Sequence, residues 1–211
     1  MRRKGLMPAI NSVLEALAQP RWAISDAPSR LPGSPGLYAA YASKEVWAEL
    51  GLGNPPDDRP LYVGKAEDSV VSRDVTTHFG DGRTGSSTLR RSLAALLRQR
   101  LGLSGVPRNP QNPGYYANYG LSAVNDRKLT DWMRTRILLA SWPAPKGADL
   151  RPIENTVIGA LRPPLNLQNA TTPWTALVRR ARKVMADEAS EYAARSADGG
   201  ETGPEGNAGG G

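Results

Sequence analysis

Two short segments that combine glycine with tyrosine constrain the fold of this chain most. Gly36-Leu37-Tyr38 opens the apolar run 36–42, and Tyr62-Val63-Gly64 lies within the run 61–65. Turn-forming residues flank both runs, which is typical of β-strands. The stretch between them holds a helical segment at residues 44–50, followed by a polar turn. We therefore expect the two strands to form a hairpin with an elaborated connection.

The remaining pattern is mostly helical. Apolar residues at helical spacing and flanking capping residues predict helices at residues 10–18, 69–79, 89–101, 126–133, 153–161 and 174–186. The short apolar run 136–142, which is closed by Pro143, predicts another strand. Residues 104–119 are dense in Pro, Gly and Asn and predict a long surface loop. From Ser196 onwards, the polar, glycine-rich composition predicts a disordered tail.

Composition narrows the chemistry. The 211 residues suffice for one ordinary domain with terminal extensions. No cysteine and a single histidine, His78, exclude disulfides, thiolate metal sites and any two-histidine metal site within one chain. A metal would need oxygen ligands, which suit Mg²⁺ or Mn²⁺. No transmembrane or signal segment is evident, so we expect a cytoplasmic protein without a membrane partner.

The net charge of +7 is compatible with two kinds of protein. Clustered Lys and Arg attract polyanions such as nucleic acid. Many basic proteins nevertheless bind no nucleic acid, so charge alone does not decide. The last predicted helix shows the same ambiguity, because its basic face, which carries Arg179, Arg180, Arg182 and Lys183, is either solvated or in contact with a nucleic-acid backbone.

The chain can supply the groups that phosphodiester hydrolysis requires. That reaction needs a base for the attacking water, a cation over the phosphate and an acid or metal for the leaving oxygen. A tyrosine on a strand could act as the base, an arginine could clamp the phosphate, and a glutamate on a helix could hold one hydrated Mg²⁺. The relevant residues follow one another along the sequence in the order Tyr38, Tyr62, Arg73, His78, Glu154 and Asn166.

This ordered set, together with the segments 36–38, 62–65 and 163–166, resembles the GIY-YIG nuclease superfamily over residues 33–168. The resemblance implies an α+β fold in which helices flank a small three-stranded antiparallel sheet. It also implies single-metal hydrolysis of DNA. We accordingly expect an N-terminal helical extension at residues 1–30, a nuclease domain at 31–170, a C-terminal basic helix at 171–195 and a tail at 196–211.

The resemblance also implies roles for individual residues. Tyr38 would be the general base or its partner, and Tyr62 would shape the phosphate and water site beside it. Arg73 would stabilise the transition-state phosphate, and His78 would assist proton transfer. Glu154 would bind the metal, and Asn166 would order the region around that glutamate.

Further basic residues are candidate nucleic-acid contacts: Lys65, Arg83, Arg90 and Arg91. Arg73 and His78 are five residues apart, so on an ideal helix their side chains point about 140° away from each other. Either a local distortion brings them together, or Arg83, Arg90 or Arg91 takes the phosphate role.

The leading interpretation is a metal-dependent endonuclease acting on double-stranded DNA with Mg²⁺ or Mn²⁺. The alternative is a non-catalytic nucleic-acid-binding or interaction module that retains the same fold. A third possibility is a structural protein that is merely basic. The sequence leaves the oligomeric state and the cleavage specificity open.

Overall fold

The computed structural model describes residues 10–70, 80, 82–109, 115–168 and 171–198. Its sheet contains β1 (Trp22–Ala23), β2 (Gly36–Tyr41), β3 (Tyr62–Ala66) and β4 (Leu138–Pro143), in the order β1-β4-β2-β3. Every pairing is antiparallel. The expected α+β fold is confirmed, but the expected three strands are four, because the two-residue strand β1 pairs with Leu138 and Leu139 of β4.

The hairpin formed by β2 and β3 places the two tyrosines. Tyr38 lies opposite Gly64, and Ala40 lies opposite Tyr62. Directly opposed residues point to the same face, as do residues two apart in a strand, so Tyr38 and Tyr62 share one face of the sheet. The connection contains α3 (Lys44–Glu49), whose first turn is capped by the hydroxyl of Ser43. β3 is an edge strand of the sheet, with β2 as its neighbour.

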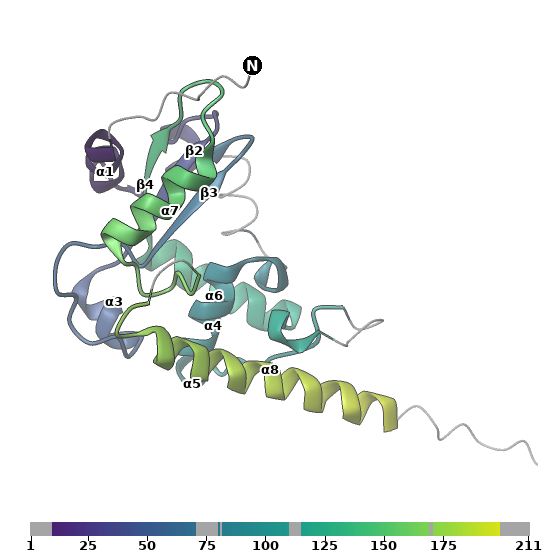
Figure 1. Ribbon diagram of the computed structural model, residues 1–211. Coiled ribbons are helices and arrows are strands. Elements are labelled where there is room, and N and C mark those ends of the chain that lie inside the picture. Colours follow the sequence, from purple (N-terminus) through teal and green to yellow (C-terminus); the bar gives the residue numbers. More distant parts are fainter. Residues whose placement is uncertain (1–9, 71–79, 81, 110–114, 169–170, 199–211) are drawn as a thin grey trace, which may run out of the picture.

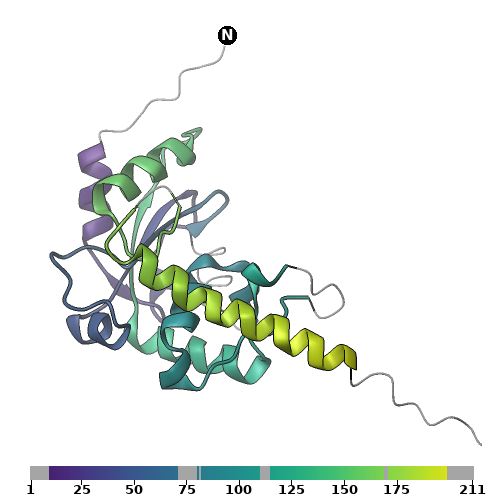
Figure 2. The same ribbon diagram turned by 60° about the horizontal axis from the view of Figure 1, so that its bottom comes forward.

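Helices cover both faces of the sheet (Figures 1 and 2). On one face lie α1 (Ile10–Ala18) and α7 (Leu150–Leu161). Their apolar residues join the odd-numbered positions of β2 in one core cluster: Val13, Leu17, Leu37, Ala39, Tyr41, Val63, Ala140, Trp142, Leu150, Ile153, Val157 and Ile158. The N-terminal helix is therefore packed into the domain instead of extending from it.

The other face is covered by α4 (Thr88–Leu96), α6 (Ala123–Arg136) and α8 (Thr175–Asp198). These helices occupy the lower half of the molecule in Figure 1. Their cluster contains Tyr38 and Ala40 from β2, with Leu89 and Leu93 of α4. The even-numbered positions of β2 thus pack against a different set of helices from the odd-numbered ones, as the two-residue period of a strand requires.

Shorter elements complete the described part of the chain. They are α2 (Ala27–Arg30), the 3₁₀ turns η2 (Thr84–Ser86) and η3 (Tyr116–Asn118), and α5 (Arg98–Leu101), which continues from α4 after Leu97. A bridge between Val106 and Gly120 closes the base of the predicted loop 104–119. Tyr119 at the end of this loop is fully buried and donates its hydroxyl hydrogen to the carbonyl of Arg91. The loop is therefore anchored in the core at its C-terminal end.

Three helices are longer than their sequence patterns predict, and the first of these, α7, begins at Leu150 instead of residue 153. α6 begins at Ala123, where the Ser122 hydroxyl accepts a hydrogen bond from the amide of Asn125. α8 continues to Asp198, past the start of the predicted tail at Ser196. Contacts far along α8 help to hold it, because Glu188 pairs with Arg98 and also accepts from the Gly105 amide at 2.9 Å. The C-terminal basic helix is thus part of the packed domain.

Within the described residues, no helix is both long enough and apolar enough to cross a membrane. The predicted helix at residues 69–79 falls almost entirely outside the described residues.

The close contact between β2 and β4 leads to a stability prediction. A Cβ atom at Gly36 would collide with the backbone carbonyl oxygen of Trp142, which cannot move without disturbing the ladder. We expect Gly36→Ala to lower the free energy of unfolding by about 1–3 kcal/mol, the usual cost of overpacking. Urea unfolding measures this. Gly33→Ala is the matched control, because its Cβ would enter open space and its free energy of unfolding should hardly change.

Candidate active site

A polar pocket of about 340 Å³ lies beside the edge strand β3. Segments far apart in the sequence meet there: β3, α4, η3, α7, the loop after α7, and α8. The residues that line it are Tyr62, Thr88, Arg91, Tyr115, Ala117, Asn118, Glu154, Ile158, Asn166, Leu167, Gln168 and Arg182. Four of the residues singled out from the sequence are among them: Tyr62, Arg91, Glu154 and Asn166.

Tyr38 lies behind Tyr62 and is only 1% exposed. Their ring centroids are 6.1 Å apart, with an angle of 41° between the ring planes. Gly64 makes this arrangement possible, because a Cβ atom at position 64 would collide with the ring and hydroxyl of Tyr38. The glycine of the second segment therefore provides space for the tyrosine of the first.

Glu154 reaches the pocket from α7. That helix starts after Asp149, whose carboxylate accepts from the Arg151 amide at 3.1 Å, and it packs on the sheet through Ile153 and Val157. Burial raises the pKa of the Glu154 carboxyl, while the positive charges of Lys65 and Arg151 oppose that shift. Lys65 lies on β3 and forms an ion pair with Glu67 at 2.5 Å. The predicted metal ligand is thus a partly desolvated carboxylate with cations nearby.

Asn166 holds the edge of the sheet. Its side-chain oxygen accepts from the Val63 amide, and its side-chain nitrogen donates to the Val63 carbonyl, both at 2.8 Å. The neighbouring amide of Leu165 donates to the Leu61 carbonyl at 3.0 Å. These bonds satisfy outward-facing backbone groups of an edge strand, which would otherwise need water. Asn166 therefore orders the strand that carries Tyr62, and it lies close to Glu154 in the same pocket lining.

Arg91 and Arg182 bring two guanidinium groups to the pocket from α4 and α8. Burial, with a smaller effect from the charge of Arg182, lowers the pKa of Arg91 to about 10. Burial likewise lowers the pKa of Arg182, while the Tyr119 and Tyr62 hydroxyls act in the opposite direction. Across the described residues, neither arginine forms a salt bridge, and the Nε of Arg91 is buried without a hydrogen-bond partner. Two poorly compensated cations favour an anionic ligand.

Arg90 does not lie at the surface, so the expectation that it contacts nucleic acid is wrong. It is fully buried, and its guanidinium pairs with the buried Asp126 at 2.9 Å. It also donates to Thr84 and Thr130. Successive residues on a helix are about 100° apart, so Arg90 points into the core while Arg91 points into the pocket.

The other predicted residues are distributed as follows. Arg83 is exposed just before η2 and does not line the pocket. Arg73 and His78 lie outside the described residues, so their predicted roles stay predictions.

Several pocket residues were not predicted as site residues. Tyr115 and Asn118 come from the loop at 104–119, and Arg182 comes from a helix whose four basic residues were assigned to one polar face. The spacing of α8 contains the missing signal. Val178, Met185 and Ala189 are buried on one face of α8. Arg182 is four residues after Val178 and three before Met185, so it lies on that same face.

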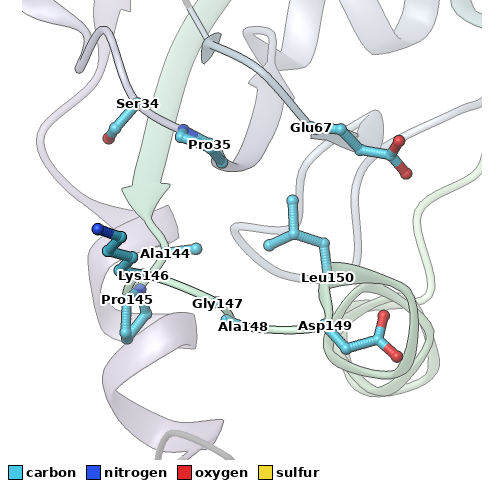
Figure 3. Close-up of a pocket in the computed structure, with 10 residues that line it drawn as sticks. All are labelled: Ser34, Pro35, Glu67, Ala144, Pro145, Lys146, Gly147, Ala148, Asp149 and Leu150. Carbon is cyan, nitrogen blue, oxygen red and sulfur yellow. The ribbon is translucent and has the colours of Figure 1, made fainter. Parts of the chain in front are cut away.

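A larger cavity of about 540 Å³ lies at the N-terminal end of α7, beside the turn after β4 (Figure 3). In Figure 3, Lys146 stands on one side of it, and Glu67 and Asp149 stand on the other. Among the described residues that line it, none is a tyrosine or an arginine, whereas the smaller pocket has both. We therefore assign the candidate site to the smaller pocket.

The donor set of the pocket fits one hydrated divalent cation better than a multi-ligand metal cage. The described residues contain no cluster of three or more His, Cys, Asp or Glu side chains. Glu154 offers carboxylate oxygens at the pocket wall, and Mg²⁺ commonly uses one or two carboxylates with waters and phosphate oxygens.

Comparison with known protein families agrees with the fold and the pocket. The GIY-YIG catalytic domain family matches residues 56–184. The match covers more than half of the chain, so this protein belongs to the GIY-YIG catalytic domain family, and the family implies nuclease-type activity in general. The matched region includes Tyr62, Arg91, Glu154, Asn166 and Arg182. No curated protein and no solved structure matches the chain.

The two hydrogen bonds between the Asn166 side chain and the Val63 backbone, which we call the clasp, lead to a prediction about stability. Asn166→Ala leaves the amide and the carbonyl of Val63 without their partner, so we expect a loss of about 1–3 kcal/mol in the free energy of unfolding. Gln168→Ala serves as the control, because Gln168 lines the same pocket but is exposed. Equal unfolding free energies for the two variants would show that the clasp does not stabilise the edge strand.

Proposed function

We propose that this protein is a metal-dependent DNA endonuclease that hydrolyses phosphodiester bonds in the pocket beside β3. The observation that supports this most is the convergence of Tyr62, Glu154, Arg91 and Arg182 on one pocket from four separate elements. Each group suits a different requirement of phosphoryl transfer. The basic composition, with a net charge of +7, favours a polyanionic substrate. Double-stranded DNA is the substrate that we propose.

Of the two tyrosines of the hairpin, Tyr62 is the one that lines the pocket, so we assign it the contact with the attacking water. Burial lowers the pKa values of the nearby Arg91 and Arg182, and the charge of an ionised Tyr62 hydroxyl opposes that shift in both. In the proposed step Tyr62 reacts as its phenolate. The phenolate oxygen takes a proton from the water and becomes the neutral hydroxyl, the water oxygen bonds to phosphorus, and the bond from phosphorus to the leaving oxygen breaks as that oxygen takes a proton from solvent. Tyr38 supports the ring of Tyr62 from behind and acts as its partner.

Arg91 is the proposed phosphate clamp. Its two terminal nitrogens donate to the Gly85 carbonyl at 2.7 Å and to the Thr88 hydroxyl at 3.3 Å, which fixes the guanidinium at the pocket wall. A guanidinium that is oriented before the substrate binds stabilises negative charge on the phosphoryl oxygens without a further cost of ordering. Among the three later arginines considered from the sequence, Arg91 alone both lines the pocket and belongs to an ordered helix.

Glu154 is the proposed metal ligand. A divalent cation bound there would polarise a phosphoryl oxygen and offset charge on the leaving oxygen. Burial raises the pKa of Glu154, so the ionised carboxylate is less stable than usual in the empty pocket. A cation removes that disadvantage, which makes Glu154 better suited to binding a metal than to stabilising the fold.

Plasmid nicking with Mg²⁺ or Mn²⁺ tests the proposal. We expect the wild-type protein to convert supercoiled DNA to nicked or linear forms, and Glu154→Gln to lower the rate about a thousandfold, since a catalytic metal supplies several kcal/mol. Glu191→Gln is the control, because Glu191 is exposed on α8 and pairs only loosely with Arg195, at 3.8 Å.

Both variants should retain the wild-type fold, as judged by circular dichroism and thermal unfolding. If wild type and Glu154→Gln behave alike on DNA and RNA substrates, the catalytic assignment is wrong. Salt-sensitive DNA binding without any cleavage would instead support a non-catalytic nucleic-acid-binding module.

A further inference from the structure

The candidate active site continues into a second hollow along α8. This hollow has a volume of about 430 Å³ and shares Ala117, Leu167, Gln168 and Arg182 with the active-site pocket. Beyond them it is lined by Arg179, Lys183 and Ala186 of α8. The two hollows therefore form one groove, which we call the α8 groove. Its lining residues place it between α8 on one side and η3 with the loop after α7 on the other.

The charges along the α8 groove are nearly all positive. Arg182 stands at the junction of the two hollows, and no ion pair involving it occurs in the described part of the chain. Within the described residues, Arg179 donates only to the Leu167 carbonyl at 3.3 Å, and no carboxylate there forms a salt bridge with it. Lys183 pairs with Asp187 at 2.7 Å, but both side chains are exposed, and such i,i+4 pairs are weak. A phosphate could therefore replace Asp187 as the partner of Lys183.

An exposed aromatic ring lies at the mouth of the active-site pocket. Tyr115 is 70% exposed, although it lines the pocket together with Arg182. Stacking of nucleobases on exposed aromatic rings beside basic grooves is a common mode of nucleic-acid binding.

We propose that the α8 groove binds the sugar–phosphate backbone of the substrate strand next to the bond that is cleaved, with Arg182, Arg179 and Lys183 contacting successive phosphates and Tyr115 stacking on an unpaired base beside the duplex. This inference rests on the proposed nuclease function and adds to it the path of the strand. It also makes α8 part of the substrate-binding surface. A row of positive side chains matches the successive phosphates of a nucleic-acid strand. The row begins at the pocket that contains Glu154, and binding of a protein partner would not account for that position.

The test measures binding separately from cleavage. Fluorescence anisotropy with a labelled DNA duplex of mixed sequence that carries a single-stranded extension is recorded in the Glu154→Gln background, without divalent cations and over a range of salt concentrations. The test variant is Arg179→Ala with Lys183→Ala. Its matched control is Arg180→Ala with Arg195→Ala, which removes two exposed cations of the same helix that lie outside the groove; Arg195, like Lys183, pairs with an acidic residue four positions away.

We expect the test variant and the control variant to differ in DNA affinity and in its dependence on salt. Loss of two phosphate contacts should lower the slope of log affinity against log salt by about 1.4–1.8 and weaken binding about tenfold at low salt. The control variant should change neither quantity by more than a small amount. Equal effects of the two variants, or no effect of either, would overturn the proposal. Thermal unfolding of both variants checks that the fold is retained.

The aromatic contact is tested in the same assay. Tyr115→Ala should weaken binding about tenfold, and Tyr115→Phe should not, because stacking requires the ring and not the hydroxyl. Tyr192→Ala, which removes another exposed tyrosine outside the groove, is the control. If wild type never cleaves DNA but the contrast between groove and control variants holds, the nuclease proposal fails and the groove stands. If cleavage occurs without that contrast, the groove proposal alone fails.

Discussion

The buried ion pair between Arg90 and Asp126 is the interaction on which the arrangement of the site depends. Asp126 accepts hydrogen bonds from the Gly82 amide and from the amide and hydroxyl of Thr84, in addition to the guanidinium of Arg90. One carboxylate thereby joins the start of α6, the turn before α4 and α4 itself. Because the rotation of α4 is fixed through Arg90, the next side chain, Arg91, is fixed at the pocket wall. Removing either partner would leave an uncompensated buried charge, which is strongly destabilising.

The edge strand β3 explains why the pocket is located where it is. An edge strand offers unpaired backbone groups on one side, and here Asn166 and Leu165 satisfy them over Leu61 and Val63. The chain after α7 is thereby held beside Tyr62, and α7 brings Glu154 to the same edge. The site therefore forms where a sheet ends and where side chains from both of its faces can meet.

Much of the fold was accessible from the sequence because it rests on local patterns. The hairpin, the inserted helix α3 and the helix α7 follow from apolar periodicity and capping residues. The strand β1 was missed because two residues carry no periodic pattern, and its pairing with β4 is decided by contacts distant in sequence. The extension of α8 was missed for a related reason, since Glu188 is held by Arg98 and Gly105.

The candidate site was predictable only in part. Tyr62, Glu154 and Asn166 could be named from their order, and the structure brings them to one pocket. The sequence could not distinguish Arg90 from Arg91, because the distinction depends on the buried carboxylate of Asp126 on another helix. Arg182 was placed with its basic neighbours on a polar face, whereas its position among the buried residues of α8 directs it toward the pocket.

The central claim is that Tyr62 and Arg91 act together on one phosphate. A double-mutant cycle on single-turnover DNA cleavage with Mg²⁺ tests this most directly, using Tyr62→Phe, Arg91→Lys and the combined variant. If the two residues share one phosphate, each single variant should cleave DNA slowly. The combined variant should lose much less of the cleavage rate than the product of the two single losses. Additive losses, or single variants as fast as the wild-type protein, would contradict a shared active site in this pocket.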